Sequence, residues 1–130
     1  MREDIATKWV AALRSGEYQQ ERGFLQTEHG HCCLGVLCDL HLRETGDGEW
    51  RPPGSGAWLH AQCYRDGLGI DGEYTPPRGV MLWADLEEDP CLRVEKPGGD
   101  VSADGIVNLN DHGYSFAQLA DLIEEQWKDL

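Results

Sequence analysis

The chain has 130 residues, and its 24 acidic residues against 11 basic ones give a formal net charge of −13. A surface this negative repels nucleic-acid phosphates and anionic lipid headgroups, which argues against direct nucleic-acid or membrane binding. The length suits a single domain over residues 1–130, and a hydrophobic content of 40% supplies a core for it.

The sequence predicts a cytosolic protein with free thiols. No apolar run approaches the ~20 residues that a bilayer-spanning helix needs. The N-terminal Met-Arg-Glu-Asp-Ile-Ala has acidic residues where a secretory signal needs a basic start and an apolar run. Five cysteines are an odd number, and a reducing cytosol disfavours disulfides.

The first predicted element is an N-terminal helix that ends near Gly16, since glycine readily takes the left-handed conformation that follows a helix. Its apolar residues recur at i, i+4, i+7 and i+8, the spacing of one helical face: Ile5, Trp9, Ala12 and Leu13. A polar segment over 18–27 follows, with Phe24-Leu25 as a possible short strand.

A second helix is predicted over 32–42, and it carries three of the five cysteines. One side of this helix holds Cys33, Leu34, Leu37, Cys38 and His41, and Val36 and Leu40 lie beside that side. A helix that is apolar nearly all round is typical of a buried position. We therefore expect it to be the central helix of the fold.

The middle of the chain, 45–72, is rich in Gly, Pro and Asp and has little periodicity, so its conformation as a whole stays open. Within it, the segments 45–49 and 51–56 predict turns and loop. Pro76-Pro77 then opens a short helix that carries Val80, Met81 and Trp83, because proline is tolerated in a first turn. Beyond Pro90, the segments 91–95 and 105–109 alternate in polarity and predict an antiparallel hairpin with 96–104 as its loop.

The last predicted element is an amphipathic C-terminal helix. Ser115 can cap it, and Gln118 occupies the third position of a capping box. Its apolar stripe consists of Phe116, Leu119, Ala120, Ile123 and Trp127. The segment 110–113 predicts the tight turn that leads into it. Together these elements predict an α+β domain with an N-terminal helix, a buried cysteine-bearing helix, a small antiparallel sheet and this C-terminal helix.

A zinc site is one hypothesis, because five potential ligands lie within ten residues: His29, His31, Cys32, Cys33 and Cys38. Structural zinc sites present ligands in two spaced pairs from loops, whereas these thiols lie on an apolar helix and no second pair exists. Buried thiols that act as packing groups explain the pattern better. We expect no metal, and the absence of nucleotide-binding glycine motifs predicts no cofactor.

Cysteine catalysis is an alternative. A thiol at a helix N-terminus, such as Cys32 or Cys33, has a lowered pKa and is more nucleophilic. His112 follows downstream, with Asn108, Asn110 or Asp111 available to orient its imidazole, in the order of papain-like hydrolases. That order is common by chance, and no oxyanion-hole signature accompanies it. A hydrolase therefore remains a second choice, with no residue assigned as catalytic.

Three segments carry a resemblance to a known group of proteins. They are Trp9 to Gln20 with Gly23 and Leu25, the run Cys32-Cys-Leu-Gly-Val-Leu-Cys-Asp-Leu, and Leu109-Asn-Asp-His-Gly-Tyr-Ser-Phe with the helix behind it. This triplet, together with the segment Pro77 to Trp83, resembles a family of small uncharacterised proteins of bacteriophages and prophages. Glu21 and Asp85 stand where that family tends to show glycine.

The resemblance implies a phage accessory protein that acts in the host cytoplasm and has no established chemistry. Such proteins often counter host defence, so the predicted function is non-catalytic binding of a host small molecule, such as a defence nucleotide. An acidic DNA mimic or an inhibitor that binds a host defence protein is a further alternative, and the oligomeric state stays open. For a nucleotide, Trp83 would stack on the base, and Arg14, Arg22 or Arg78 would meet phosphates. The other predicted ligand-binding residues are Tyr18, Gln20, Asn110 and Asp111.

Overall fold

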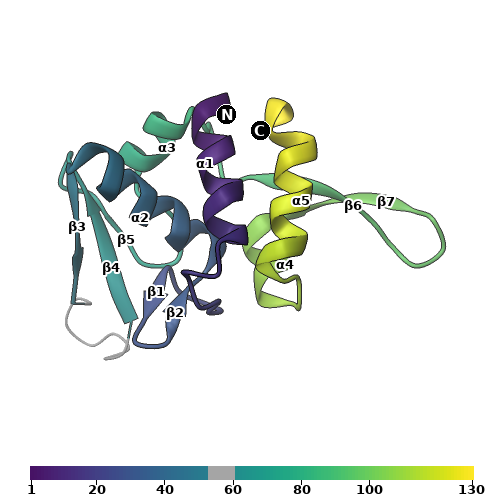
Figure 1. Ribbon diagram of the computed structural model, residues 1–130, viewed down its shortest axis with the longest axis horizontal. Coiled ribbons are helices and arrows are strands. Elements are labelled where there is room, and N and C mark those ends of the chain that lie inside the picture. The colour runs from purple at the N-terminus through teal and green to yellow at the C-terminus, as the bar shows by residue number, and fades with distance from the viewer. Residues whose placement is uncertain (53–60) are drawn as a thin grey trace.

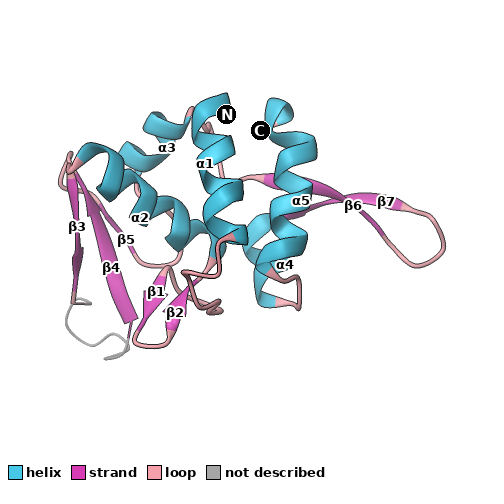
Figure 2. Ribbon diagram, in the orientation of Figure 1, coloured by secondary structure: helices cyan, strands magenta, loops and turns pink. Residues whose placement is uncertain are grey.

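The computed structural model describes residues 1–52 and 61–130, which form an α+β fold (Figure 1). The helices are α1 (Glu3–Arg14), α2 (Cys33–Thr45), α3 (Arg78–Ala84), α4 (Ile106–Asp111), α5 (Phe116–Gln126) and the 3-10 turn η1 (Trp127–Asp129). The strands are β1 (Gln26–Thr27), β2 (Gly30–His31), β3 (Gly48–Arg51), β4 (Ala61–Asp66), β5 (Asp71–Gly72), β6 (Cys91–Glu95) and β7 (Val101–Gly105). Figure 2 shows the helices gathered between the two sheets.

The cysteine-bearing helix α2 is the central helix, as predicted. It lies between α1 and the larger sheet (Figure 1), and its residues Cys33 to Cys38 are all buried. Leu34 and Leu37 have no exposed surface, and the indole Nε1 of Trp9 on α1 donates to the carbonyl of Cys33 at 2.9 Å. The helix begins one residue later than predicted, because Cys32 is its N-cap and not its first residue.

The other predicted helices are also confirmed. Gly16 takes the left-handed conformation (φ 77°) just beyond α1, and Pro77 is the N-cap of α3. Asp85 ends α3 with φ 57°, a left-handed conformation that glycine adopts more easily. Ser115 and Gln118 form both bonds of the predicted capping box at the start of α5.

The larger sheet contradicts part of the predicted turns and loop, because β3 covers 48–51 and so overlaps both 45–49 and 51–56. The sequence makes no prediction for the rest of 45–72, where β4 and β5 lie. The order of this sheet is β2-β1-β4-β3, all antiparallel, and β5 pairs with the other half of β4. Four of the six residues of the central strand β4 are buried, and Tyr64 among them has no exposed surface. Short strands separated by Gly and Asp turns give too little alternation to be seen in the sequence. Residues 53–60, which include most of the predicted loop 51–56, lie outside the described residues.

The hairpin exists, but its second strand was predicted at the wrong place. β7 covers 101–105, inside the predicted loop, and pairs with β6 from Cys91↔Gly105 to Glu95↔Val101. The predicted strand 105–109 is instead helix α4, and the predicted turn 110–113 begins with its last two residues. Ile106, Leu109 and Asn110 are buried at i, i+3 and i+4, the spacing of a helical face. Burying these three residues on one face of a helix therefore determines the structure here, in spite of the alternating polarity that predicted a strand.

The predicted strand Phe24-Leu25 lies two residues too early, since β1 covers Gln26–Thr27. The two ends of the chain meet, because the amino group of Met1 donates to the carbonyl of Leu130 at 2.5 Å. α1 and α5, the helices next to these two ends, lie side by side (Figure 1). The hairpin β6–β7 projects from the side of α5 that faces away from α1. Over residues 1–52 and 61–130, no helix combines the length and apolarity needed to cross a membrane.

Candidate functional site

The three thiols of the Cys-Cys-Leu-Gly-Val-Leu-Cys run lie in the protein interior. Cys32, Cys33 and Cys38 are each at most 3% exposed. Cys32 caps α2 by accepting a hydrogen bond at Sγ from the N–H of Gly35 at 3.4 Å. Burial raises the pKa of Cys32 to about 11 in spite of these helix N–H groups, and it raises the pKa of Cys33 and Cys38 well above their usual range. At neutral pH all three are therefore neutral thiols.

The residues of the cysteine hydrolase alternative do not form a catalytic arrangement in the described structure. His112 is exposed, and its Nδ1 lies 2.8 Å from the carbonyl oxygen of Asn108 one turn earlier. The amide of Asn108 bonds to Asp104. Among residues 1–52 and 61–130, no three His, Cys, Asp or Glu side chains lie close enough together to hold a metal ion.

Three of the predicted ligand-binding residues, Gln20, Asn110 and Asp111, do come together. Asn110 is fully buried and joins α4 to α2 and to the loop that follows α1. Its Oδ1 accepts from the N–H of Cys33 at 3.2 Å and from Gln20 at 3.0 Å. Its Nδ2 donates to the carbonyl of Glu21 at 2.9 Å and to Asp111 at 3.1 Å. All four hydrogen-bonding positions of this amide are filled by protein groups, so it ties the fold together.

The remaining bonds of Gln20 and Asp111 serve the same junction. Gln20 donates to the carbonyl of Tyr114 at 2.8 Å and accepts from the N–H of Phe116 at 3.1 Å, at the start of α5. Asp111 accepts from the N–H of Gly23 at 3.1 Å. These two side chains therefore hold the loop after α1 against α4 and α5.

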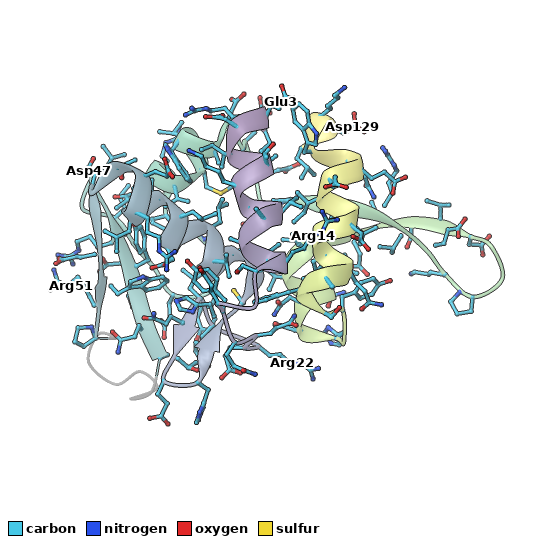
Figure 3. All side chains as sticks on the ribbon, viewed as in Figure 1. Glu3, Arg14, Arg22, Asp47, Arg51 and Asp129 are labelled. Carbon is cyan, nitrogen blue, oxygen red and sulfur yellow. The ribbon has the colours of Figure 1, made fainter. Side chains whose placement is uncertain are left out.

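The three predicted arginines lie apart. Arg14 forms ion pairs with Asp121 at 2.6 Å and Glu124 at 2.7 Å, where α1 meets α5 (Figure 3). Arg22 is exposed at the lower end of the molecule in Figure 3, beside a shallow hollow of about 250 Å³. Arg78 is exposed at the start of α3, beside a hollow of about 500 Å³. The structure does not gather them around one phosphate position.

The other two predicted residues, Tyr18 and Trp83, lie at opposite ends of one chain of ring contacts. Each ring meets the next edge to face, with centroid distances between 5.0 and 5.7 Å. The order is Tyr18, His31, Trp50, Tyr64, His41 and Trp83. The chain runs between α2 and the larger sheet. Its inner rings, Tyr64 and His41, are buried, whereas Tyr18, His31 and Trp50 are only half-buried.

Asp39 of α2 organises the half-buried end of this chain. Its carboxylate accepts from the Tyr18 hydroxyl at 2.5 Å and from the Trp50 indole at 3.1 Å. Arg43, one helical turn later, lies 3.2 Å from the same carboxylate and places its guanidinium 5.4 Å from the Tyr18 ring centroid. Burial raises the pKa of Tyr18, and the hydrogen bond to Asp39 is the second largest cause of this rise, so the phenol stays protonated.

His31 completes this end of the chain. Its Nε2 lies 2.8 Å from the amide nitrogen of Gln26, so the amide donates and the imidazole accepts. Burial lowers the pKa of His31, which keeps the ring neutral near pH 7. We call Tyr18, His31, Asp39, Arg43 and Trp50 the Asp39 cluster. It brings together rings, a carboxylate and a cation at a partly exposed surface.

Sequence reasoning found only Tyr18 of this cluster. One signal was present: Asp39 is the one acidic residue within the apolar run Cys32 to Leu42, and Arg43 stands at i+4 from it, the spacing of a helical ion pair. The contribution of Trp50 had no such signal, because Trp50 lies in 45–72, a segment with too little periodicity to predict its conformation.

Comparison with known proteins places the chain in a family but gives no activity. No curated protein and no solved structure matches it. A family model, the domain of unknown function DUF8296, matches residues 1–127 and so covers nearly all of the fold described above. The chain therefore belongs to the DUF8296 family.

Proposed function

We propose that this protein is a phage accessory protein that acts in the host cytoplasm by binding a small host molecule without converting it. The proposed ligand contains an aromatic ring and a negative charge, as a defence nucleotide does. The phage origin and the anti-defence role are supported by the three sequence segments that resemble a phage protein family. The ligand class is supported by the Asp39 cluster.

The observation that carries the ligand class is a cation beside half-buried rings. The bases of nucleotides stack on aromatic side chains regardless of their sequence, and an arginine next to the ring adds attraction for an anionic group. Trp50, Tyr18 and His31 offer such rings. Arg43 lies next to them, is 57% exposed, and pairs with Asp39 at 3.2 Å and with Glu17 at 3.6 Å, so an anionic ligand would compete with these carboxylates for it. The hydrogen bonds of Asp39 hold Trp50 and Tyr18 in place before any ligand arrives, which lowers the entropic cost of binding.

Binding without catalysis is favoured by the state of the thiols. A cysteine hydrolase needs a thiolate in contact with a base. Cys32, at the position of highest helix-dipole influence, is 3% exposed and remains protonated at neutral pH. The burial of these thiols supports binding over the hydrolase alternative, whose candidate nucleophiles are Cys32 and Cys33.

Calorimetric titration of the protein with a panel of cyclic and linear nucleotides tests the proposal. We expect at least one member to bind, and Trp50→Leu to weaken that binding about tenfold or more through loss of one stacked ring. Trp127→Leu is the matched control, because Trp127 is also half-buried beside a cation, Lys128, but lies on η1 outside the cluster. No binding across the panel, or equal losses in both variants, would refute the small-ligand proposal.

A further inference from the structure

The hairpin β6–β7 has one strand edge that faces a groove. β6 pairs only with β7 among the described residues, and the hairpin extends away from the helices (Figure 1). In an antiparallel pair, residues bonded to the partner strand alternate with residues whose N–H and C=O point outward. The bonds Ile106 N–H to Pro90 O and Lys96 N–H to Asp100 O place the bonded positions at even numbers. Arg93 and Glu95 therefore direct their main-chain groups away from β7.

At Arg93 a side-chain amide already fills this outer edge and forms the hydrogen bonds that a neighbouring strand would form. The side-chain amide of Gln126, buried at the end of α5, accepts from the N–H of Arg93 at 2.7 Å and donates to its carbonyl at 2.9 Å. A neighbouring strand would form the same two bonds. Two residues further along, Glu95 presents the next outward pair of main-chain groups with no side chain of this kind against it in the described part of the chain.

The edge at Glu95 opens onto a groove of about 640 Å³ between the hairpin and α5. This volume lies within the roughly 300–1,000 Å³ of typical binding clefts. Val94, Leu122 and Tyr114 give the groove an apolar lining, and Val101 at its side is 61% exposed. The arrangement of an open strand edge above an apolar groove is the one used for binding an extended peptide.

The negative charge of the groove favours a positively charged occupant. Its acidic residues are Glu95, Asp121 and Glu125. Asp121 is paired with Arg14, and the groove's own Arg93 is paired with Asp129 at 3.0 Å. Among the ion pairs of residues 1–52 and 61–130, none involves Glu95 or Glu125. A second copy of this chain would bring further negative charge to these two carboxylates, whereas a basic segment would neutralise them.

We propose that this groove binds an extended, lysine- or arginine-bearing segment of a partner protein, which adds to β6 as a third strand at Glu95. Alternate side chains of the segment would lie on Val94 and Leu122, and the basic ones between them would meet Glu95 and Glu125. This surface is separate from the Asp39 cluster, so the inference does not depend on the small-ligand proposal.

The test uses two acetylated eight-residue peptides, one of alternating lysine and valine and one of alternating glutamate and valine. Binding is followed by fluorescence anisotropy at two salt concentrations and mapped by NMR on the labelled full chain. We expect only the lysine peptide to bind, more weakly at high salt, with shifts concentrated at 93–95 and 118–126. Shifts spread over the whole acidic surface, or equal binding of both peptides, would overturn the proposal.

Proline variants separate strand addition from simple charge attraction. Glu95→Pro removes the outward N–H without breaking a bond to β7, and we expect it to weaken lysine-peptide binding by about tenfold. Ala103→Pro is the control, because it removes an outward N–H from the opposite edge of the hairpin and should leave binding within about twofold. If Glu95→Pro disturbs folding, the pair Glu95→Gln and Glu125→Gln tests the charges alone. A wild-type dimer that dissociates on Glu95→Pro in sedimentation would show a second copy on this edge and overturn the proposal.

Discussion

Gly35, in the first turn of α2, packs directly against the main chain of Leu25. A methyl group on Gly35 would overlap the carbonyl oxygen of Leu25 and approach its carbonyl carbon. The same carbonyl accepts a hydrogen bond from the N–H of Cys32 at 3.3 Å, so the backbone of Leu25 cannot retreat freely. This contact explains why a buried helix contains glycine, which lowers helix stability by about 1 kcal/mol relative to alanine.

Gly35→Ala is therefore expected to destabilise the protein, although alanine is the better helix former. Overpacking of this kind costs about 1–3 kcal/mol of the free energy of unfolding. Gly105→Ala is the matched control, because its added methyl meets no atom within 4 Å and its φ of −63° suits alanine. Urea denaturation of both variants checks the prediction. Equal midpoints would mean that α2 does not press on Leu25.

Leu37→Ala tests the burial of α2 itself. Leu37 has no exposed surface, and its removal leaves a cavity in the main core. Such substitutions cost about 2–5 kcal/mol. The control is Leu82→Ala on α3, whose side chain is 57% exposed and should change stability by about 0.5 kcal/mol or less. An unchanged thermal transition for Leu37→Ala would contradict the central position of α2.

The parts of the fold that sequence reasoning found are those with a long repeat and local end signals. α1 and α5 each present an apolar stripe over three turns, and the capping box of Ser115 and Gln118 marks one start unambiguously. β1, β2 and β5 have two residues each, too few for any alternation to appear. Their pairing depends on contacts between distant segments, such as Gln26 with Gln62, which no local pattern encodes.

The candidate site divides in the same way. Asn110 and Gln20 were predicted to bind a ligand because they are polar residues in loop-like segments. The structure does bring them together, but their hydrogen bonds go to each other, to Asp111 and to the backbone. Whether a polar side chain faces a ligand or the N–H of Cys33 depends on how α4 packs against α2. Asp39 was passed over because it stands within an apolar helix, yet it holds the half-buried rings in place.

Asn110→Ala should destabilise the protein by about 1–3 kcal/mol, because the buried N–H of Cys33 loses its acceptor. Asn110→Asp keeps the acceptor for that N–H and should cost less if the Cys33 bond dominates. Asn108→Ala is the control, since Asn108 is exposed and bonds to Asp104. Chemical denaturation of the three variants gives the order, and a neutral Asn110→Ala would show that the junction is held by apolar contacts instead.

Ser115→Ala should cost about 1 kcal/mol through loss of the N-cap of α5. The serine hydroxyl accepts from the N–H of Gln118 at 3.2 Å, and the Gln118 side chain accepts from the N–H of Ser115 at 2.9 Å. Ser15→Ala, just beyond the end of α1, removes a hydroxyl that donates to the carbonyl of Ala12 at 2.7 Å and accepts from the N–H of Glu17 at 3.1 Å. This hydroxyl caps no helix N-terminus, so its loss should change stability by less. Thermal unfolding of both variants measures the difference, which vanishes if the capping box does not hold in solution.

The buried thiols predict a loss of stability at alkaline pH. The pKa of Cys32 is about 11 in the folded protein against 9.0 for an ordinary thiol. Below pH 9 the thiol is protonated in both states, so stability there does not depend on it. Between pH 9 and 11 the unfolded chain loses this proton while the folded chain retains it, and the free energy of unfolding falls by about 1.4 kcal/mol per pH unit.

Urea denaturation under reducing conditions at several pH values between 8 and 11 checks this dependence. We expect Cys32→Ala to show a shallower fall than the wild type, even though it also loses a cap and is less stable at every pH. Cys91→Ser is the control, because Cys91 is the exposed thiol and its removal should leave the slope unchanged. All three proteins contain the same tyrosines and lysines, so these residues do not affect the comparison. Equal slopes for Cys32→Ala and the wild type would show that this sulfur is accessible to water, which would support the nucleophilic role of the hydrolase alternative.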